Sequence, residues 1–238
     1  MKSFLVLFFL SLSLAVSAQS QETISGNGKI KKEKRNASGS FDEIQVSGRY
    51  KVLFRQGSTT SIEVEADENL LPYIETNVDG AELQVHSKKG YNVKPTATIV
   101  VYITLPKLSS LQSSGSSSFS GEGSLKGDKL EISLSGKADV DLSLNYSGLE
   151  LAVSGSGMVK LAGSVTKVEV NISGSGEFVA PDMKSQNMEI NISGNGNAHV
   201  NVEKKLEIAI SGNGKVKYKG SAITEQAVAG NGRVEHEN

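Results

Sequence analysis

The chain contains no cysteine and no tryptophan, and only 4 of its 238 residues are proline. Without cysteine it can form neither disulfides nor thiolate metal sites, so its stability must come from a packed core and backbone pairing. Its charges nearly cancel, with 25 Lys+Arg against 26 Asp+Glu. This balance argues against a nucleic-acid binder, which needs a strongly basic face. No run of about 20 apolar residues is present to span a bilayer.

The first 18 residues have the pattern of an export signal. Lys2 supplies the positive start, Phe4 to Val16 is apolar apart from serines, and Val16-Ser17-Ala18 is a small-residue cleavage site. We therefore expect residues 1–18 to be removed and the protein to be periplasmic, on the outer surface or secreted. Loss of Lys2 leaves 24 basic against 26 acidic residues, a net charge of −2.

Glycine is abundant, and its distribution is periodic. Of the 25 glycines, 18 lie in residues 111–238, where Pro181 is the single proline. They recur in a Ser-Gly-x-Gly motif whose successive first glycines are separated by 21, 19, 19, 20, 18 and 18 residues. Those first glycines are Gly115, Gly136, Gly155, Gly174, Gly194, Gly212 and Gly230. A fixed period of this length is typical of a repeat architecture.

Apolar residues flank each motif at even offsets from its first glycine. Before Gly155, for example, they occupy positions −6, −4 and −2, and after it they occupy +4 and +6. An even spacing indicates strands with one buried face. We expect the glycines to form corners with positive φ. The Ser and Asn residues between them could bond their own backbone or stack in polar ladders from coil to coil.

One coil of this repeat cannot be stable alone. Ordering about 19 residues costs roughly 1–2 kcal/mol each, whereas burying about five apolar side chains contributes roughly 1.5–3 kcal/mol each. Coils must therefore share a core with their neighbours. A parallel β-helix fits best, and an antiparallel barrel or prism of hairpins stays open. The last copy replaces the apolar triplet with Thr224, Gln226 and Val228, which predicts a polar terminal coil.

The N-terminal half is less regular. We expect a linker or edge strand over residues 19–39, a β subdomain over 40–110, and the solenoid over 111–238 continuing the same domain. Expected strands are Phe41–Val46, Tyr50–Arg55, Ser61–Ala66, Glu82–His86 and Thr98–Leu105, with a helical turn over Glu68–Ile74 broken by Pro72. A motif copy at Ile24–Ile30 leads into a basic run, which either is a solvated linker or edge strand or contacts an anionic surface or polysaccharide. The run consists of Lys29, Lys31, Lys32, Lys34 and Arg35.

The order of segments resembles a known family. Phe41–Gly48, Lys51–Gly57, Asp67–Leu71 and Ile103–Leu108, followed by the Ser-Gly repeats, are similar to the putative auto-transporter adhesin head GIN domain family, exported proteins common in Bacteroidetes. The resemblance spans about residues 40–235. It implies a right-handed β-helix-like fold and an adhesin role, and it supplies no catalytic or binding residues.

No catalytic, cofactor or metal site is predicted. The solenoid turns carry Ser, Asn and Lys where calcium-binding turns need Asp, and the three histidines (His86, His199 and His236) have no metal-ligand spacing. Asp139 and Asp141 should share one face of a strand, where they either act as a carboxylate pair or simply face solvent. The glycine motifs lack the helix and Lys-Ser/Thr pair of a phosphate loop.

Three functions remain open. The first is a non-catalytic exported solenoid that binds a surface, a glycan or a protein partner as an adhesin does. The second is a polysaccharide-active lyase or hydrolase, for which Arg49, Tyr50, Arg55 and Tyr91 are the only candidate cluster. The third is a passive structural module that forms homo-oligomers through exposed strand edges.

Overall fold

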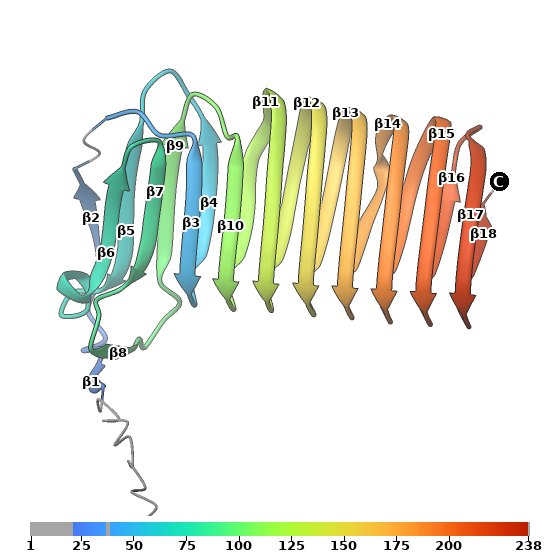
Figure 1. The fold of residues 1–238 in the computed structure, drawn as a ribbon. Coiled ribbons are helices and arrows are strands. Elements are labelled where there is room, and N and C mark those ends of the chain that lie inside the picture. Colours follow the sequence, from blue (N-terminus) through green and yellow to red (C-terminus); the bar gives the residue numbers. More distant parts are fainter. Residues whose placement is uncertain (1–20, 37–38, 238) are drawn as a thin grey trace, which may run out of the picture.

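The computed structural model describes residues 21–36 and 39–237, so the expected export signal at 1–18 lies outside the described residues. The described chain is an all-β structure in which flattened coils stack side by side (Figure 1). The N-terminal strands are β1 (Glu22–Ser25), β2 (Ile30–Arg35), β3 (Glu43–Gly48), β4 (Lys51–Gln56), β5 (Ser61–Asp67), β6 (Ile74–Asp79), β7 (Glu82–Ser87), β8 (Tyr91–Lys94) and β9 (Val100–Leu105). The solenoid strands are β10 (Ser110–Gly115), β11 (Ser118–Gly136), β12 (Asp139–Gly155), β13 (Met158–Gly174), β14 (Glu177–Gly194), β15 (Asn197–Gly212), β16 (Lys215–Lys219), β17 (Ile223–Gly230) and β18 (Arg233–His236).

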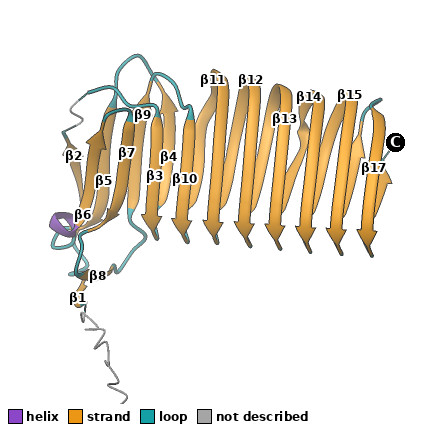
Figure 2. Ribbon diagram, viewed as in Figure 1, coloured by secondary structure: helices purple, strands orange, loops and turns teal. Residues whose placement is uncertain are grey.

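The strands of the solenoid pair in parallel throughout, which excludes the alternative of an antiparallel barrel or prism of hairpins. Strands β10 to β18 pair only in parallel with one another, and equivalent motif residues face each other in every coil, as Gly136 faces Gly155 and Gly155 faces Gly174. Each long strand turns a corner and contributes to two sheets, one on each side of the core (Figure 2). The predicted β-helix-like solenoid is therefore confirmed.

The core contains the residues predicted from the even offsets, and it also contains residues that were not predicted, such as Leu144 and Val165. In β12 and β13, for instance, Leu151, Val153, Val170 and Ile172 are all buried, and the same holds for their equivalents in neighbouring coils. Because side chains of a strand alternate between its two faces, the intervening residues point to solvent. Stacked apolar columns thus form one continuous core along the solenoid.

The corners behave as the repeat predicts. Gly174 has a φ of 115°, and a Cβ added to it would lie 2.7 Å from the carbonyl oxygen of Gly155 in the preceding coil. In the last three coils the residue after the corner glycine bonds to its counterpart: Asn213 Nδ2 donates to Asn195 Oδ1 at 2.9 Å, and Asn231 Nδ2 donates to Asn213 Oδ1 at 3.2 Å. The expected polar ladder from coil to coil is present over these coils.

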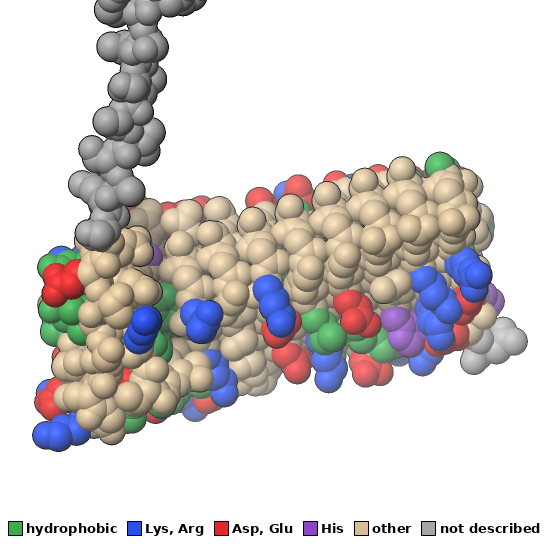
Figure 3. Space-filling view, turned by 90° about the horizontal axis from the view of Figure 1, so that it is seen from below, with side chains coloured by type: hydrophobic (Ala, Val, Ile, Leu, Met, Phe, Trp, Pro, Cys, Tyr) green, Lys and Arg blue, Asp and Glu red, His purple; other side chains and the backbone are tan. Residues whose placement is uncertain are grey.

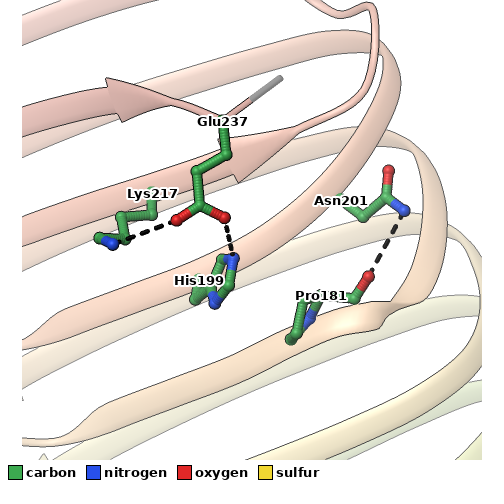
Figure 4. A network of polar contacts seen from close by, with 5 residues as sticks. All are labelled: Pro181, His199, Asn201, Lys217 and Glu237. Atoms are coloured by element: carbon green, nitrogen blue, oxygen red, sulfur yellow. Dashed lines mark hydrogen bonds and ion pairs between the residues drawn. The ribbon is translucent and has the colours of Figure 1, made fainter.

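Each coil has a second corner, which follows the buried residue six positions after the corner glycine. This second corner is not marked by glycine in every coil. There the strands continue through the bend, and the register of β14 shifts once against β13 and twice against β15. Asn201 Nδ2 donates to the Pro181 carbonyl at 3.4 Å, and the Ser185 hydroxyl donates to the Asn201 carbonyl at 2.9 Å, so the bulge is tied to the next coil (Figure 4). Pro181 fits here because a bulge spares it the ladder bond that it cannot donate.

The N-terminal strands extend the same two sheets. Strand β3 pairs in parallel with β10 and β7, and Gly48 stacks on Gly115 as the offsets predicted. Antiparallel pairs close this end, with β6 on β7 and with β2 and β9 on β5. Strands β6 and β8 were not predicted, whereas β1 and β2 both lie in the expected linker or edge strand over residues 19–39. The expected helical turn is a 3-10 helix, η1 (Leu71–Tyr73), and Pro72 lies inside it because the first turn needs no proline N–H.

The basic run lies in β2, which is an edge strand. Two of its lysines have carboxylate partners in or just after the neighbouring strand β5: Lys32 Nζ lies 3.7 Å from Glu65, and Lys31 Nζ lies 3.3 Å from Glu68. Lys32 Nζ also lies 3.5 Å from the centre of the Tyr102 ring. Arg35 pairs with Glu33 at 3.1 Å. These partners favour the edge-strand interpretation over contact with an anionic surface.

The early motif copy is not a solenoid corner, because it wraps a buried carboxylate. Asp67 is fully buried and accepts hydrogen bonds from Gly28 N at 2.7 Å, Thr96 N at 2.9 Å and Thr96 Oγ1 at 2.6 Å. A side chain at Gly26 would overlap that carboxylate. Burial pushes the pKa of Asp67 up, but these donors outweigh it and hold the pKa below its usual 3.8.

Replacing Asp67 by Asn should lower the free energy of unfolding by about 1–3 kcal/mol at neutral pH, because an amide NH2 would face N–H donors. A depressed folded pKa stabilises the fold above pH 3.8, and that contribution is lost as the pH falls through the folded pKa. The difference in the free energy of unfolding between wild type and Asp67→Asn should therefore become smaller at low pH. Urea unfolding from pH 7 to pH 3 measures it, with the exposed Asp79→Asn as control; a gap that does not change with pH contradicts the assignment.

Candidate binding face

The outer surface of one sheet, which we call the ladder face, is built from three columns of aligned side chains. It comprises β7, β3, β10, the second halves of β11 to β15, and β17. Residues one before each corner glycine form a serine column, in which each member faces its neighbour in register. Its members are Ser47, Ser114, Ser135, Ser154, Ser173, Ser193, Ser211 and Ala229. The column places a hydroxyl on nearly every coil.

The middle column, three residues before each glycine, mixes amides and small residues. It consists of Gln45, Gln112, Ser133, Ala152, Asn171, Asn191, Ala209 and Ala227. Asn191 Nδ2 donates both to Asn171 Oδ1 at 3.2 Å and to Glu189 Oε1 at 3.1 Å. These bonds fix the amides in place along the sheet.

A glutamate column borders the ladder face at five residues before each glycine. It consists of Glu43, Ser110, Glu131, Glu150, Glu169, Glu189, Glu207 and Glu225, and Glu82 continues it on β7. Lysines two residues earlier offset part of the charge, as Lys129 Nζ does at 2.8 Å from Glu150. Sequence reasoning missed this column, although the recurrence of Glu at one offset was visible in the last six copies.

A groove of about 1220 Å³ runs between the serine and middle columns from Ser47 to Ala229. Its floor is the backbone of the residues between the columns, such as Val153 and Ile172, whose side chains point into the core. The groove exists because both columns have short side chains while the sheet beneath is continuous. It follows the solenoid axis and presents similar groups once per coil.

The opposite sheet exposes side chains of both charges, such as Asp141, Lys160 and Glu177. Figure 3, which looks onto the edge formed by the corner glycines, shows a largely uncharged band along that edge with charged side chains gathered along one side of it. Near the last coil, Glu237 accepts from His199 Nε2 at 2.9 Å and from Lys217 Nζ at 3.1 Å (Figure 4). The Lys217 hydrogen bond, with help from His199, holds the pKa of Glu237 below its usual value.

The four residues considered for polysaccharide chemistry do not form one site. Arg49 and Tyr50 line a common cavity, but Arg55 pairs with Glu122 at 3.1 Å on the opposite sheet. The Tyr91 ring packs against Tyr73 with centroids 4.7 Å apart. Burial raises the pKa of Tyr50, against the effect of its hydrogen bond with Ser87. The cluster therefore has no shared reacting centre.

The other candidate groups are also dispersed. His86 lies 3.6 Å from Glu75, His199 binds Glu237, and His236 stacks on Tyr218. Asp139 and Asp141 share one exposed strand face, as expected. Over residues 21–36 and 39–237 no group of three or more His, Cys, Asp or Glu side chains could hold a metal ion. None of the helices described is long and apolar enough to cross a membrane.

Several solved structures share the fold. A putative adhesin from Bacteroides fragilis is 23% identical, covers 90% of this chain and 100% of its own, and superposes with a TM-score of 0.85. A putative lipid binding protein from Parabacteroides distasonis is 26% identical, with coverages of 91% and 100% and a TM-score of 0.76. A putative adhesin from Parabacteroides merdae is 28% identical, with coverages of 91% and 100% and a TM-score of 0.70. No curated protein matches the chain.

The family assignment rests on most of the described chain. The model of the family described as "Putative auto-transporter adhesin, head GIN domain" matches residues 40–222, from the strands before the solenoid almost to its last coil. Its name is that of surface-exposed exported adhesins and not of an enzyme family. The chain belongs to the putative auto-transporter adhesin head GIN domain family.

Proposed function

We propose that this protein is a non-catalytic, exported adhesin-like protein that binds an extended glycan chain along the groove of the ladder face. The observation that carries the proposal is the groove itself, which has a volume of about 1220 Å³ and is bordered by hydroxyls and amides in register. A polymer with a regular repeat could make similar contacts on successive coils. Many weak contacts of this kind add up, because each is made within one bound chain.

The chemistry of the groove favours a neutral or amino-bearing glycan over an acidic one. Serine hydroxyls and the amides of Asn171 and Asn191 can each donate and accept hydrogen bonds, as sugar hydroxyls do. The glutamate column beside them would repel a polyanion. Export through a signal at residues 1–18 would place this face where envelope or external glycans are found.

A second candidate is binding of an acyl chain. The last coils line the groove with Ala209, Ala227, Val228 and Ala229, and Val228 is 44% exposed. The similar structure from Parabacteroides distasonis carries the description of a putative lipid binding protein. Binding of lipid and not of glycan would favour this candidate.

Replacing Ser173 by Arg should weaken glycan binding at least about tenfold, because a long charged side chain would fill the middle of the groove. A glycan array identifies the ligand, and calorimetry on that ligand measures the change in Kd. Ser147→Arg is the matched control, since Ser147 is exposed on β12 and outside the groove. Equal effects of the two variants, or no glycan bound by the wild type, would reject the groove as the binding site.

The non-catalytic part of the proposal needs a separate test. Each polysaccharide bound on the array should be recovered intact after incubation with the protein, as judged by its size and reducing ends. Cleavage that survives extensive purification would support the lyase or hydrolase alternative instead. Self-association on a sizing column, without any ligand, would favour the structural module.

A further inference from the structure

A second cavity lies at the end of the groove, around the corner formed by Gly48 and Gly115. It has a volume of about 670 Å³ and is lined by residues of β3, β7, β8 and β10 and of the connections next to them. Ser47 and Ser114, which begin the groove, directly precede the two corner glycines that line the cavity. The cavity is in the size range of small-molecule sites.

The charged lining of this cavity is entirely positive. Arg49 and Lys94 both line it and are both exposed, and no carboxylate belongs to the lining. Within residues 21–36 and 39–237 neither cation forms an ion pair. This contrasts with the β2 lysines, several of which are paired with glutamates. Two unmatched cations in one concave site favour an anion.

The remaining lining supplies hydrogen bonds and an apolar wall. The Tyr50 hydroxyl lies 3.0 Å from the Ser87 hydroxyl, and Tyr50 is buried. If Tyr50 donates to Ser87, the Ser87 hydrogen stays free to donate to a ligand. Val93, Pro95 and Ile99 add apolar surface against which a sugar ring can pack.

We propose that this cavity binds the anionic group of an acidic sugar, with Arg49 and Lys94 contacting a carboxylate or sulfate and the apolar wall contacting the ring. The site is separate from the proposed groove and requires no binding there. Arg49 presents a planar fork of donors suited to an oxyanion, and Lys94 supplies a mobile point charge. The neighbouring Ser87 and Asn92 provide polar groups for the sugar hydroxyls.

Calorimetry with three small probes tests the site: sodium glucuronate, glucose 6-sulfate and neutral methyl glucoside. We expect at least one acidic probe to bind with a Kd of about 1 mM or lower and the neutral probe to bind at least about tenfold more weakly. Arg49→Gln combined with Lys94→Gln should weaken acidic binding at least about tenfold, since each lost charged hydrogen bond is worth about that much. The probe that binds decides between carboxylate and sulfate.

The matched control is Lys137→Gln. Lys137 follows Gly136 as Arg49 follows Gly48, and it is exposed but outside the cavity. Lys137→Gln should leave the Kd for the acidic probe within about twofold of the wild-type value, and so should the groove variant Ser173→Arg. Failure of this site is therefore distinguishable from failure of the groove. Failure of both acidic probes to bind, equal binding of the neutral probe, or equal loss with Lys137→Gln would overturn the proposal.

Discussion

Replacing Gly174 by Ala should lower the free energy of unfolding by about 2–4 kcal/mol, although it adds a single methyl group. The φ of 115° is a conformation that residues with a Cβ avoid, and the new Cβ would lie 2.7 Å from the Gly155 carbonyl oxygen. That oxygen cannot move away freely, because it accepts the Ser175 N–H at 2.9 Å. Relief of the clash would therefore break a ladder bond at the corner.

Gly148→Ala is the control for this change. Gly148 lies in β12 without a positive φ, and its added Cβ would lie 3.7 Å from Lys129 Cγ and 4.0 Å from the Asp128 carbonyl oxygen, both ordinary contacts. We expect no loss of stability there, or a gain of about 0.4–1 kcal/mol from the stiffer unfolded chain. Urea unfolding of the two variants and the wild type measures the difference. Similar effects at both positions would show that the corner does not require glycine.

The sequence was sufficient to predict the solenoid because its physical causes are local and repeated. Leu151, Val170 and Ile190 stand at one offset in successive coils, and each is buried. A corner glycine marks where each coil turns, and its spacing sets the coil length. Gly48 obeyed the same offsets, so the first coil of the N-terminal half could be recognised as well.

The second corner and the strands that close the N-terminal end could not be predicted from the sequence in the same way. Strands pass through that corner without a break, and the extra residues around Pro181 are absorbed by bulges whose partners, such as Asn201, lie in another coil. Strand β8 has only four residues, and its partner β1 is distant in sequence, whereas β6 forms a hairpin with β7 that was not recognised. The early motif copy has a different role from the solenoid corners, because its glycines contact the buried Asp67 carboxylate and not a neighbouring coil.

The candidate sites were only partly predictable. The Ser and Glu columns follow directly from odd offsets, since residues of one offset must align when coils stack. The groove depends on the size of two adjacent columns taken together, and the cavity depends on β8, which the sequence did not predict. Arg49 and Tyr50 were recognised as notable residues, but their neighbour Lys94 comes from this unpredicted strand.

Phe178→Ala should cost about 3–5 kcal/mol, the largest loss we expect from a single truncation in the core. Phe178 is fully buried in β14, and its register partner in the next coil is Ala198. The large Phe178 and the small Ala198 together fill a stretch of the core column that two valines fill in other coils. Ala198→Phe alone should cost about 1–3 kcal/mol by overpacking, because Phe178 already occupies the space.

The double variant, with Phe178→Ala and Ala198→Phe, should be more stable than the sum of the two losses predicts, by about 1 kcal/mol or more. The new ring would occupy part of the space that the old one left. Ala198→Phe combined with Phe119→Ala is the matched control, since Phe119 is also buried but belongs to β11, four coils from Ala198. The losses in the free energy of unfolding from those two substitutions should add within about 0.5 kcal/mol. Additive losses in the adjacent pair would mean that each coil packs its own core independently, whereas coupling confined to adjacent coils would show that the column is the unit of packing.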